Sequence, residues 1–220
     1  MDNIILVTFK QEESLLRVVD EFSQTPSSEN YSVMQAAILR KSSGNIIRER
    51  NLLFNEELGA KHLTDNLIDS MISVMSGPIG SIIGGYTAPL LDAELNARQI
   101  VEEAGMLEAI GAKLNESEWA MILLVREHNE ISLSSHLNRM GASAVVRKDA
   151  ALVAYEVMNA RAIRSEWEER SGAFPAESDE AFKDSIRNEL RERNQRNSYE
   201  HEQSLRERLD SDFAHIEPKN

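Results

Sequence analysis

The chain carries the same order of patterns twice, which restricts the fold more than any other feature. The first copy begins with a short apolar run at residues 4–9, the length of a buried strand. Apolar residues at helical spacing follow at 11–22, and 31–40 again suits a strand. A turn containing Gly44 then leads to the hairpin partner at 46–54. This part of the chain is therefore predicted as β-α-β-β.

The second copy follows after an interval of about sixty residues. Strand patterns at 119–125 and 143–147 enclose a short helix pattern at 131–140, which ends at Gly141. Two split β-α-β units that close on one antiparallel sheet form a ferredoxin-like α+β fold. We therefore predict a ferredoxin-like domain.

The remaining segments divide the chain into predicted units. The ferredoxin-like domain takes residues 1–57 and 115–158, and an inserted helical hairpin takes 58–114. The second helix of this insertion is predicted over 93–114. A charged helical extension takes 159–220, with a break after Gly172. We expect the sheet domain to fold without the residues that follow this break.

The insertion contains a glycine-rich stretch, residues 70–91, without any charge. It is long enough to cross a bilayer, but half of it is Gly, Ser, Pro or Thr. Small residues recur every four positions, which allows close helix packing, and Pro78 suits the first turn of a new helix. We predict helix packing here, with membrane association and ligand binding as alternatives. The predicted helix-packing or oligomer contacts are Ser73, Gly77, Gly80, Ser81, Gly84 and Gly85.

Several segments together resemble a known family. They are the run Ile-Ile-Leu-Val-Thr-Phe at 4–9, Ile79-Gly-Ser-Ile-Ile-Gly-Gly, Glu108-Ala-Ile-Gly-Ala-Lys-Leu, Trp119-Ala-Met-Ile-Leu-Leu-Val-Arg and Met140-Gly-Ala-Ser-Ala-Val-Val-Arg. Over about residues 3–155 the chain resembles the bacterial family catalogued as domain of unknown function 1269. Many relatives carry a more apolar glycine-rich hairpin and are labelled predicted membrane proteins. The resemblance implies no catalytic residues.

The amino-acid composition and motifs limit which catalytic, metal-binding and nucleic-acid-binding sites the chain can form. The chain has no cysteine, which excludes disulfides, thiol nucleophiles and thiolate metal sites. Its five histidines form no metal-type pair, and no nucleophile elbow or phosphate loop is present. The formal net charge of −13 argues against a protein that coats nucleic acid. We therefore predict no enzyme, no cofactor, no metal and no specific nucleic-acid partner.

The C-terminal extension interleaves acidic and basic residues around a thin apolar row. A helix with so narrow an apolar face is marginal alone, so it should dock, pair as a coiled coil or remain partly disordered. The predicted tail contacts are Phe182, Ile186, Leu190, Leu205, Leu209 and Phe213. Four arginines cluster at Arg187, Arg191, Arg193 and Arg196. We predict that they form a solvated helix face, with binding to RNA or anionic lipid as the alternative.

These observations predict a non-catalytic, self-assembling cytoplasmic protein. Its contact elements would be the glycine-rich hairpin and the charged tail, and its partner a second copy of the chain. One alternative is a membrane-associated protein that inserts residues 70–91. Another is a small-ligand or regulatory binding domain.

Overall fold

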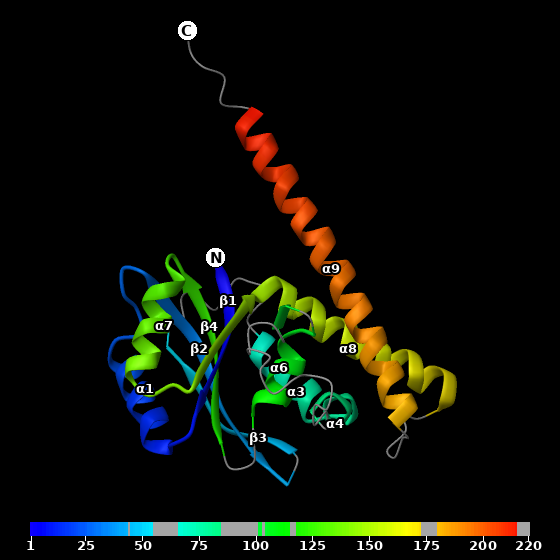
Figure 1. The fold of residues 1–220 in the computed structure, drawn as a ribbon, viewed down its shortest axis with the longest axis horizontal. Helices are drawn as coiled ribbons and strands as arrows, with labels where there is room; N and C mark the ends of the chain where they lie inside the picture. Colours follow the sequence, from blue (N-terminus) through cyan, green and yellow to red (C-terminus); the bar gives the residue numbers. More distant parts are fainter. Residues whose placement is uncertain are drawn as a thin grey trace.

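The computed structural model describes residues 1–43, 45–54, 66–84, 101–102, 104–114, 118–172 and 180–214. Within these residues the protein has one five-stranded antiparallel sheet and seven helices, which confirms the predicted α+β class (Figure 1). The strands are β1 (Asp2–Phe9), β2 (Tyr31–Ser42), β3 (Asn45–Leu53), β4 (Trp119–Glu127) and β5 (Ala144–Asp149). The helices are α1 (Glu12–Gln24), α3 (Leu67–Met75), α4 (Pro78–Gly84), α6 (Met106–Lys113), α7 (Glu130–Arg139), α8 (Ala150–Ser171) and α9 (Glu180–Ala214).

The strands lie in the order β3-β2-β4-β1-β5, and each neighbouring pair is antiparallel. In the central strand β4, Leu123 lies opposite Ile5 of β1 and opposite Ala36 of β2. Helix α1 connects β1 to β2 across β4, and α7 connects β4 to β5 across β1. All five segments predicted as strands belong to this sheet. The apolar runs of β1, β2 and β4 suit strands that are covered on both faces, whereas the edge strand β3 is polar and mostly exposed.

Helices α1 and α7 cover one face of the sheet (Figure 1). Alternate strand residues point to this face, because successive side chains of a strand lie on opposite sides. The apolar spacing predicted for 11–22 supplies the α1 side of the contact. The core on this face includes Ile5, Val7 and Phe9 of β1, Val18 and Phe22 of α1, and Leu133 and Leu137 of α7.

Helices α3, α4, α6 and α8 cover the opposite face, joined by the first half of α9. The buried side chains here include Ile4 and Leu6 of β1, Ile68 and Met71 of α3, Ile110 of α6, Val153 of α8 and Ile186 of α9. Parts of the predicted insertion and of the predicted extension thus share one core with the sheet.

Helices α3 and α4 meet at a tight corner formed by Ser76 and Gly77. Helix α4 begins at Pro78, as predicted, because proline suits the first helical turn. Gly80 packs against the α3 end so closely that an added Cβ would lie 1.9 Å from the carbonyl oxygen of Met75. The second half of the predicted glycine-rich hairpin, including Gly85, lies outside the described residues.

The helix predicted over 93–114 is not continuous in the part of that range that is described. Helix α6 begins only at Met106, after Gly105 with a φ of +106°, a conformation that L residues rarely adopt. An added Cβ at Gly105 would lie 2.9 Å from the carboxylate of Glu156. The helix prediction was wrong here because this carboxylate comes from α8, far away in the sequence.

Helix α8 is followed by Gly172, which has a φ of +77° and lies at the predicted break. Helix α9 returns along α8 and then continues beyond the rest of the molecule (Figure 1). It therefore has a docked half and a projecting half.

Candidate interaction surface

Apolar contacts anchor the docked half of α9. Ile186 and Leu190 are fully buried, and the ring of Phe182 packs edge-on against Trp167 with centroids 4.8 Å apart. These three residues were predicted as tail contacts, and they contact the same chain. The expectation that the sheet domain folds without α9 is therefore at odds with this packing, since removal would expose core residues.

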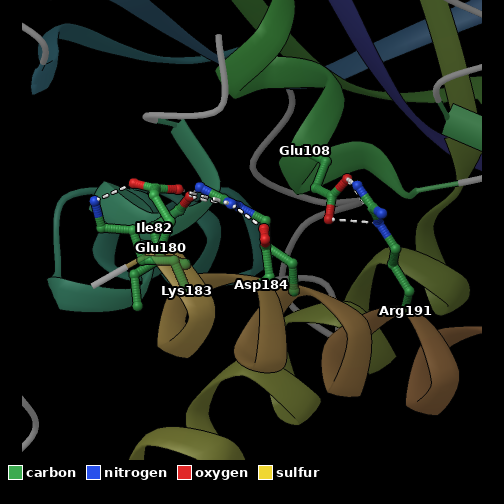
Figure 2. Close-up of polar contacts among 7 residues, drawn as sticks. Ile82, Glu108, Glu180, Lys183, Asp184 and Arg191 are labelled. Atoms are coloured by element: carbon green, nitrogen blue, oxygen red, sulfur yellow. Dashed lines mark hydrogen bonds and ion pairs between the residues drawn. The ribbon is translucent and has the colours of Figure 1, made fainter. Parts of the chain in front are cut away.

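Arg187 ties α9 to the C-terminal end of α4, and Figure 2 labels two of its partners, Ile82 and Asp184. Its Nε and Nη2 donate to the carbonyl oxygen of Ile82 at 3.1 and 2.9 Å, and its Nη1 donates to Asp184 at 2.7 Å. Carbonyl groups in the last turn of a helix lack partners within the helix, and a cation is favourable there. The buried guanidinium thus satisfies a backbone group of α4.

Arg191 ties α9 to α6 through Glu108 (Figure 2). Its Nη2 lies 2.8 Å from Oε2 of Glu108, and its Nε lies 3.1 Å from Oε1. Burial raises the pKa of the Glu108 carboxyl above its ordinary value of 4.5, and Arg191 opposes the rise without cancelling it. The guanidinium is the counter-charge for a carboxylate that has lost its water.

Polar contacts also connect α9 to α8. Arg193 donates to both oxygens of Glu166 at 3.0 and 2.8 Å, and this hydrogen bonding lowers the pKa of Glu166. Farther along, Asn159 of α8 donates to the side-chain oxygen of Asn194 at 2.9 Å. The basic cluster predicted as a solvated face thus makes intramolecular contacts at three of its four positions, those of Arg187, Arg191 and Arg193.

A second buried acid, Glu156, organises the N-terminal end of α6. Glu156 of α8 accepts hydrogen bonds from the backbone N–H groups of Met106 and Leu107 at 3.0 and 3.1 Å. Lys148 of β5 lies 2.6 Å from the same carboxylate. A carboxylate at a helix N-terminus satisfies unpaired donors and is stabilised by the helix dipole. Glu156 therefore fixes where α6 begins.

The projecting half of α9 is exposed. All residues from 202 to 208 are exposed, and the side chains include an apolar one, Leu205, at 40% of its full exposure. Tyr199, at 62%, stands where the helix leaves the domain. Positions 209 and 213 continue the helix, although the side chains of Leu209 and Phe213 lie outside the described residues.

A cleft of about 230 Å³ lies where α9 leaves the domain. Its walls come from Lys148 and Glu102 on one side and from Tyr199 and Ser198 of α9 on the other. A neighbouring cleft of about 220 Å³ along β5 shares Glu102 and Lys148. The walls of the two clefts combine acidic and basic side chains with apolar surface.

The predicted small-residue contacts do not share one surface. Ser73 and Ser81 are exposed, whereas Gly80 is buried against the end of α3. Ser73 and Gly77 line a groove of about 70 Å³ beside Ala160 of α8. Gly84 is the last residue of α4, and Gly85 lies outside the described residues.

Among the described residues, no group of three or more metal-ligating side chains is close enough to hold a metal ion. His128 is exposed and follows the last residue of β4. The ring of His136 packs beside both Phe22 and Tyr31, with ring centroids 6.3 and 6.4 Å away. Its Nε2 is 2.9 Å from Oε1 of Glu21, without hydrogen-bond geometry. This arrangement offers no nucleophile and is best described as packing.

The two tryptophans serve as packing residues in the described structure. Trp119 packs at the rim of the first core, with the guanidinium of Arg40 5.7 Å from its ring centre. Trp167 packs against Phe182. Both aromatic rings therefore act as packing anchors.

No family model, curated protein or solved structure matches this chain. The resemblance noted in the sequence therefore stays a prediction. In the described part of the chain, no helix has the length and apolar character that crossing a membrane requires.

Sequence reasoning missed two of the main residues of the α9 interface, Glu108 and the carbonyl of Ile82. Glu108 stands among the apolar residues Leu107, Ala109 and Ile110, and an acid in an apolar run is a signal of a buried ion pair. The Ile82 carbonyl left no signal, since any residue carries one. The interface therefore combines predictable apolar positions with polar contacts that only the fold brings together.

Proposed function

We propose that the protein is a non-catalytic assembly protein that self-associates through the projecting half of α9. The sheet domain serves as the scaffold, and we propose that it is ferredoxin-like. Its strand order supports this, because each β-α-β unit places one strand of the other unit between its own two strands. In this proposal, the binding partner of each chain is a second copy of the same chain.

The observation that carries the proposal is the change along α9 from docked to projecting. The docked half is held by buried apolar residues and by three arginines, whereas residues 202–208 are exposed. A short helix without tertiary contacts is only marginally stable in water. Pairing with another helix would bury Leu205 and stabilise the segment.

The test compares the native mass of the full chain with that of a chain ending at His201. The shorter chain keeps every docked contact described above. We expect the full chain to form an assembly of at least two 24.8 kDa subunits, and the shorter chain to be monomeric with unchanged thermal unfolding. A monomeric full chain, or an equal number of subunits in both assemblies, would contradict the proposal.

The proposal of no nucleic-acid partner has its own support. Arg187, Arg191 and Arg193 are engaged with acids or a carbonyl group of the same chain. Phosphate binding would have to break these contacts. The acidic balance of the whole chain opposes it further.

Membrane insertion by residues 70–91 has weaker support. The apolar side chains of α3 and α4, including Met71, Ile79 and Ile83, pack in the core of the sheet domain. Insertion would have to remove them from that core. We therefore place the protein in the cytoplasm as part of this proposal.

A second candidate function is small-ligand binding in the two clefts that share Lys148 and Glu102. Thermal unfolding measured against a panel of small carboxylates and amines would test it. A ligand at about 100 times its Kd stabilises a protein by roughly 2.7 kcal/mol, which raises the melting temperature measurably. The absence of any shift would exclude those ligand classes.

A further inference from the structure

We propose that the projecting halves of α9 from two copies pair antiparallel, with position 209 of each chain at the centre. This inference rests on the proposed self-association and specifies its geometry. It follows from the face that α9 turns toward its own domain and from the order of charges along the helix.

One face of α9 continues from the docked half into the projecting half. Helix residues three or four apart share a face. This face, named here the inner face, runs through Arg187, Arg191, Asn194, Ser198, Glu202 and Leu205. At Arg187 and Arg191 the inner face contacts α4 and α6, whereas at Glu202 and Leu205 the inner face is exposed. The inner face is therefore covered by its own domain at Arg187 and Arg191 and uncovered at Glu202 and Leu205, where Leu205 is the apolar residue.

The position of the domain opposes a parallel pair. At Arg187, Arg191 and Asn194 the inner face contacts α4, α6 and α8 of its own chain. A second helix that ran parallel along this face would have to occupy the same space. The projecting half of α9 extends beyond the domain (Figure 1). An antiparallel helix would therefore overlap only this half and place its own domain at the far end.

The order of charges favours the same direction. In the sequence, Arg206 and Arg208 precede Asp210 and Asp212. A parallel pair would bring basic positions beside basic ones and acidic beside acidic. An antiparallel pair centred on 209 brings each basic position beside an acidic position of the other chain. In the same register Leu205 lies opposite position 213, so apolar positions also coincide.

Single-cysteine cross-linking tests this register directly, because the natural chain has no cysteine. In the full chain, Leu209→Cys is expected to form a disulfide-linked dimer with itself. Leu205→Cys alone is expected to remain uncross-linked, and a mixture of Leu205→Cys with Phe213→Cys chains to cross-link. Glu207→Cys, on the opposite face of the helix, is the control and should not cross-link.

The outcomes separate this inference from the proposed function. Efficient cross-linking of Leu205→Cys with itself, in chains that still assemble, would overturn the antiparallel pairing and leave self-association intact. A monomeric natural chain without cross-links in any variant would overturn both. Because Leu205 is already 40% exposed, these variants are expected to fold.

Charge reversal gives a second readout. Replacing Arg206 and Arg208 by Asp should weaken self-association about tenfold, because four like-charge contacts replace four favourable ones. A mixture with chains bearing Asp210→Arg and Asp212→Arg should recover assembly. Equal assembly of the reversed chain and the natural chain at low salt would contradict the pairing.

Discussion

Arg191 of α9 and Glu108 of α6 form a forked ion pair, although 83 residues separate them in the sequence. The Glu108 side chain is 6% exposed and that of Arg191 is 28% exposed. An acid so deeply buried remains charged at the expense of its hydration, and the guanidinium offsets only part of that loss. Helix α9 thus supplies a counter-charge that the rest of the domain needs.

The first prediction concerns the pH dependence of stability at Glu108. Burial raises its pKa in the folded protein, so the folded chain binds this proton more tightly than the unfolded chain. Its contribution to stability is therefore present at acidic pH and lost as pH rises from 4.5 through the raised pKa. The free energy of unfolding of Glu108→Gln and of the natural chain is to be measured by urea unfolding. The difference between them should change in favour of the variant as pH rises from mildly acidic to neutral.

Glu166→Gln provides a control with the opposite sign. The hydrogen bond from Arg193 lowers the pKa of Glu166, so this carboxylate stabilises the folded protein at neutral pH and the effect is lost below about pH 4.5. The Glu166→Gln variant should therefore lose relative stability as pH rises from strongly acidic to neutral. Parallel pH profiles for the two variants would contradict these assignments.

The second prediction concerns the buried guanidinium of Arg187. Arg187→Met keeps an apolar stem but leaves the Ile82 carbonyl without its two donors. We expect a loss of about 1–3 kcal/mol in the free energy of unfolding. Arg193→Met, on the same helix but more exposed, should cost less than about 1 kcal/mol. Equal losses in urea unfolding would argue against the role of the α4 carbonyl.

The third prediction uses two neighbouring glycines. At Gly80 an added Cβ would lie 1.9 Å from the backbone oxygen of Met75, whereas at Gly77 the nearest atom would be 3.3 Å away. Overpacking of this kind typically costs about 1–3 kcal/mol. Gly80→Ala should therefore lower the melting temperature clearly, and Gly77→Ala should change it little. The reverse order would place the tight contact elsewhere.

The fourth prediction concerns the docked half of α9. A chain that ends at Gly172 loses the buried side chains of Ile186 and Leu190 and leaves Glu108 without Arg191. The two apolar side chains alone correspond to about 3–6 kcal/mol of burial. We expect this chain to unfold at much lower urea concentration than a chain ending at His201. Equal urea midpoints for the two chains would instead support the expectation that the sheet domain folds without α9.

The sequence was sufficient for β1, β2 and β4 because each is a short apolar run, and for the polar edge strand β3 because the turn predicted at Gly44 precedes it. It was also sufficient at Pro78, where ring geometry alone determines that a helix can begin. It failed around Gly105, because an uninterrupted helical pattern gives no information on a carboxylate that arrives from α8. A local sequence pattern predicts local geometry only, whereas the helix break at Gly105 depends on the distant carboxylate of Glu156.

The same limit applies to the α9 surface. The apolar spacing of Phe182, Ile186 and Leu190 predicted a contact face, and the structure places all three against the same chain. The clustered arginines had no visible partners in the sequence, since Glu108 and Ile82 belong to helices far upstream. Charge clusters therefore cannot be assigned to solvent or to a partner before the fold is known.

The placement of β1 has a consequence for synthesis on the ribosome. In the sheet, β1 pairs with β4 and β5 only. In the β1–β4 pair, Asp2 lies opposite Arg126, 124 residues away in the sequence. The β2–β3 hairpin can close early, whereas β1 must wait for most of the chain. Nascent chains stalled before residue 119 should therefore remain sensitive to protease over residues 2–9. The first strand to leave the exit tunnel is among the last to find its neighbours, and chaperones have the longest access to it.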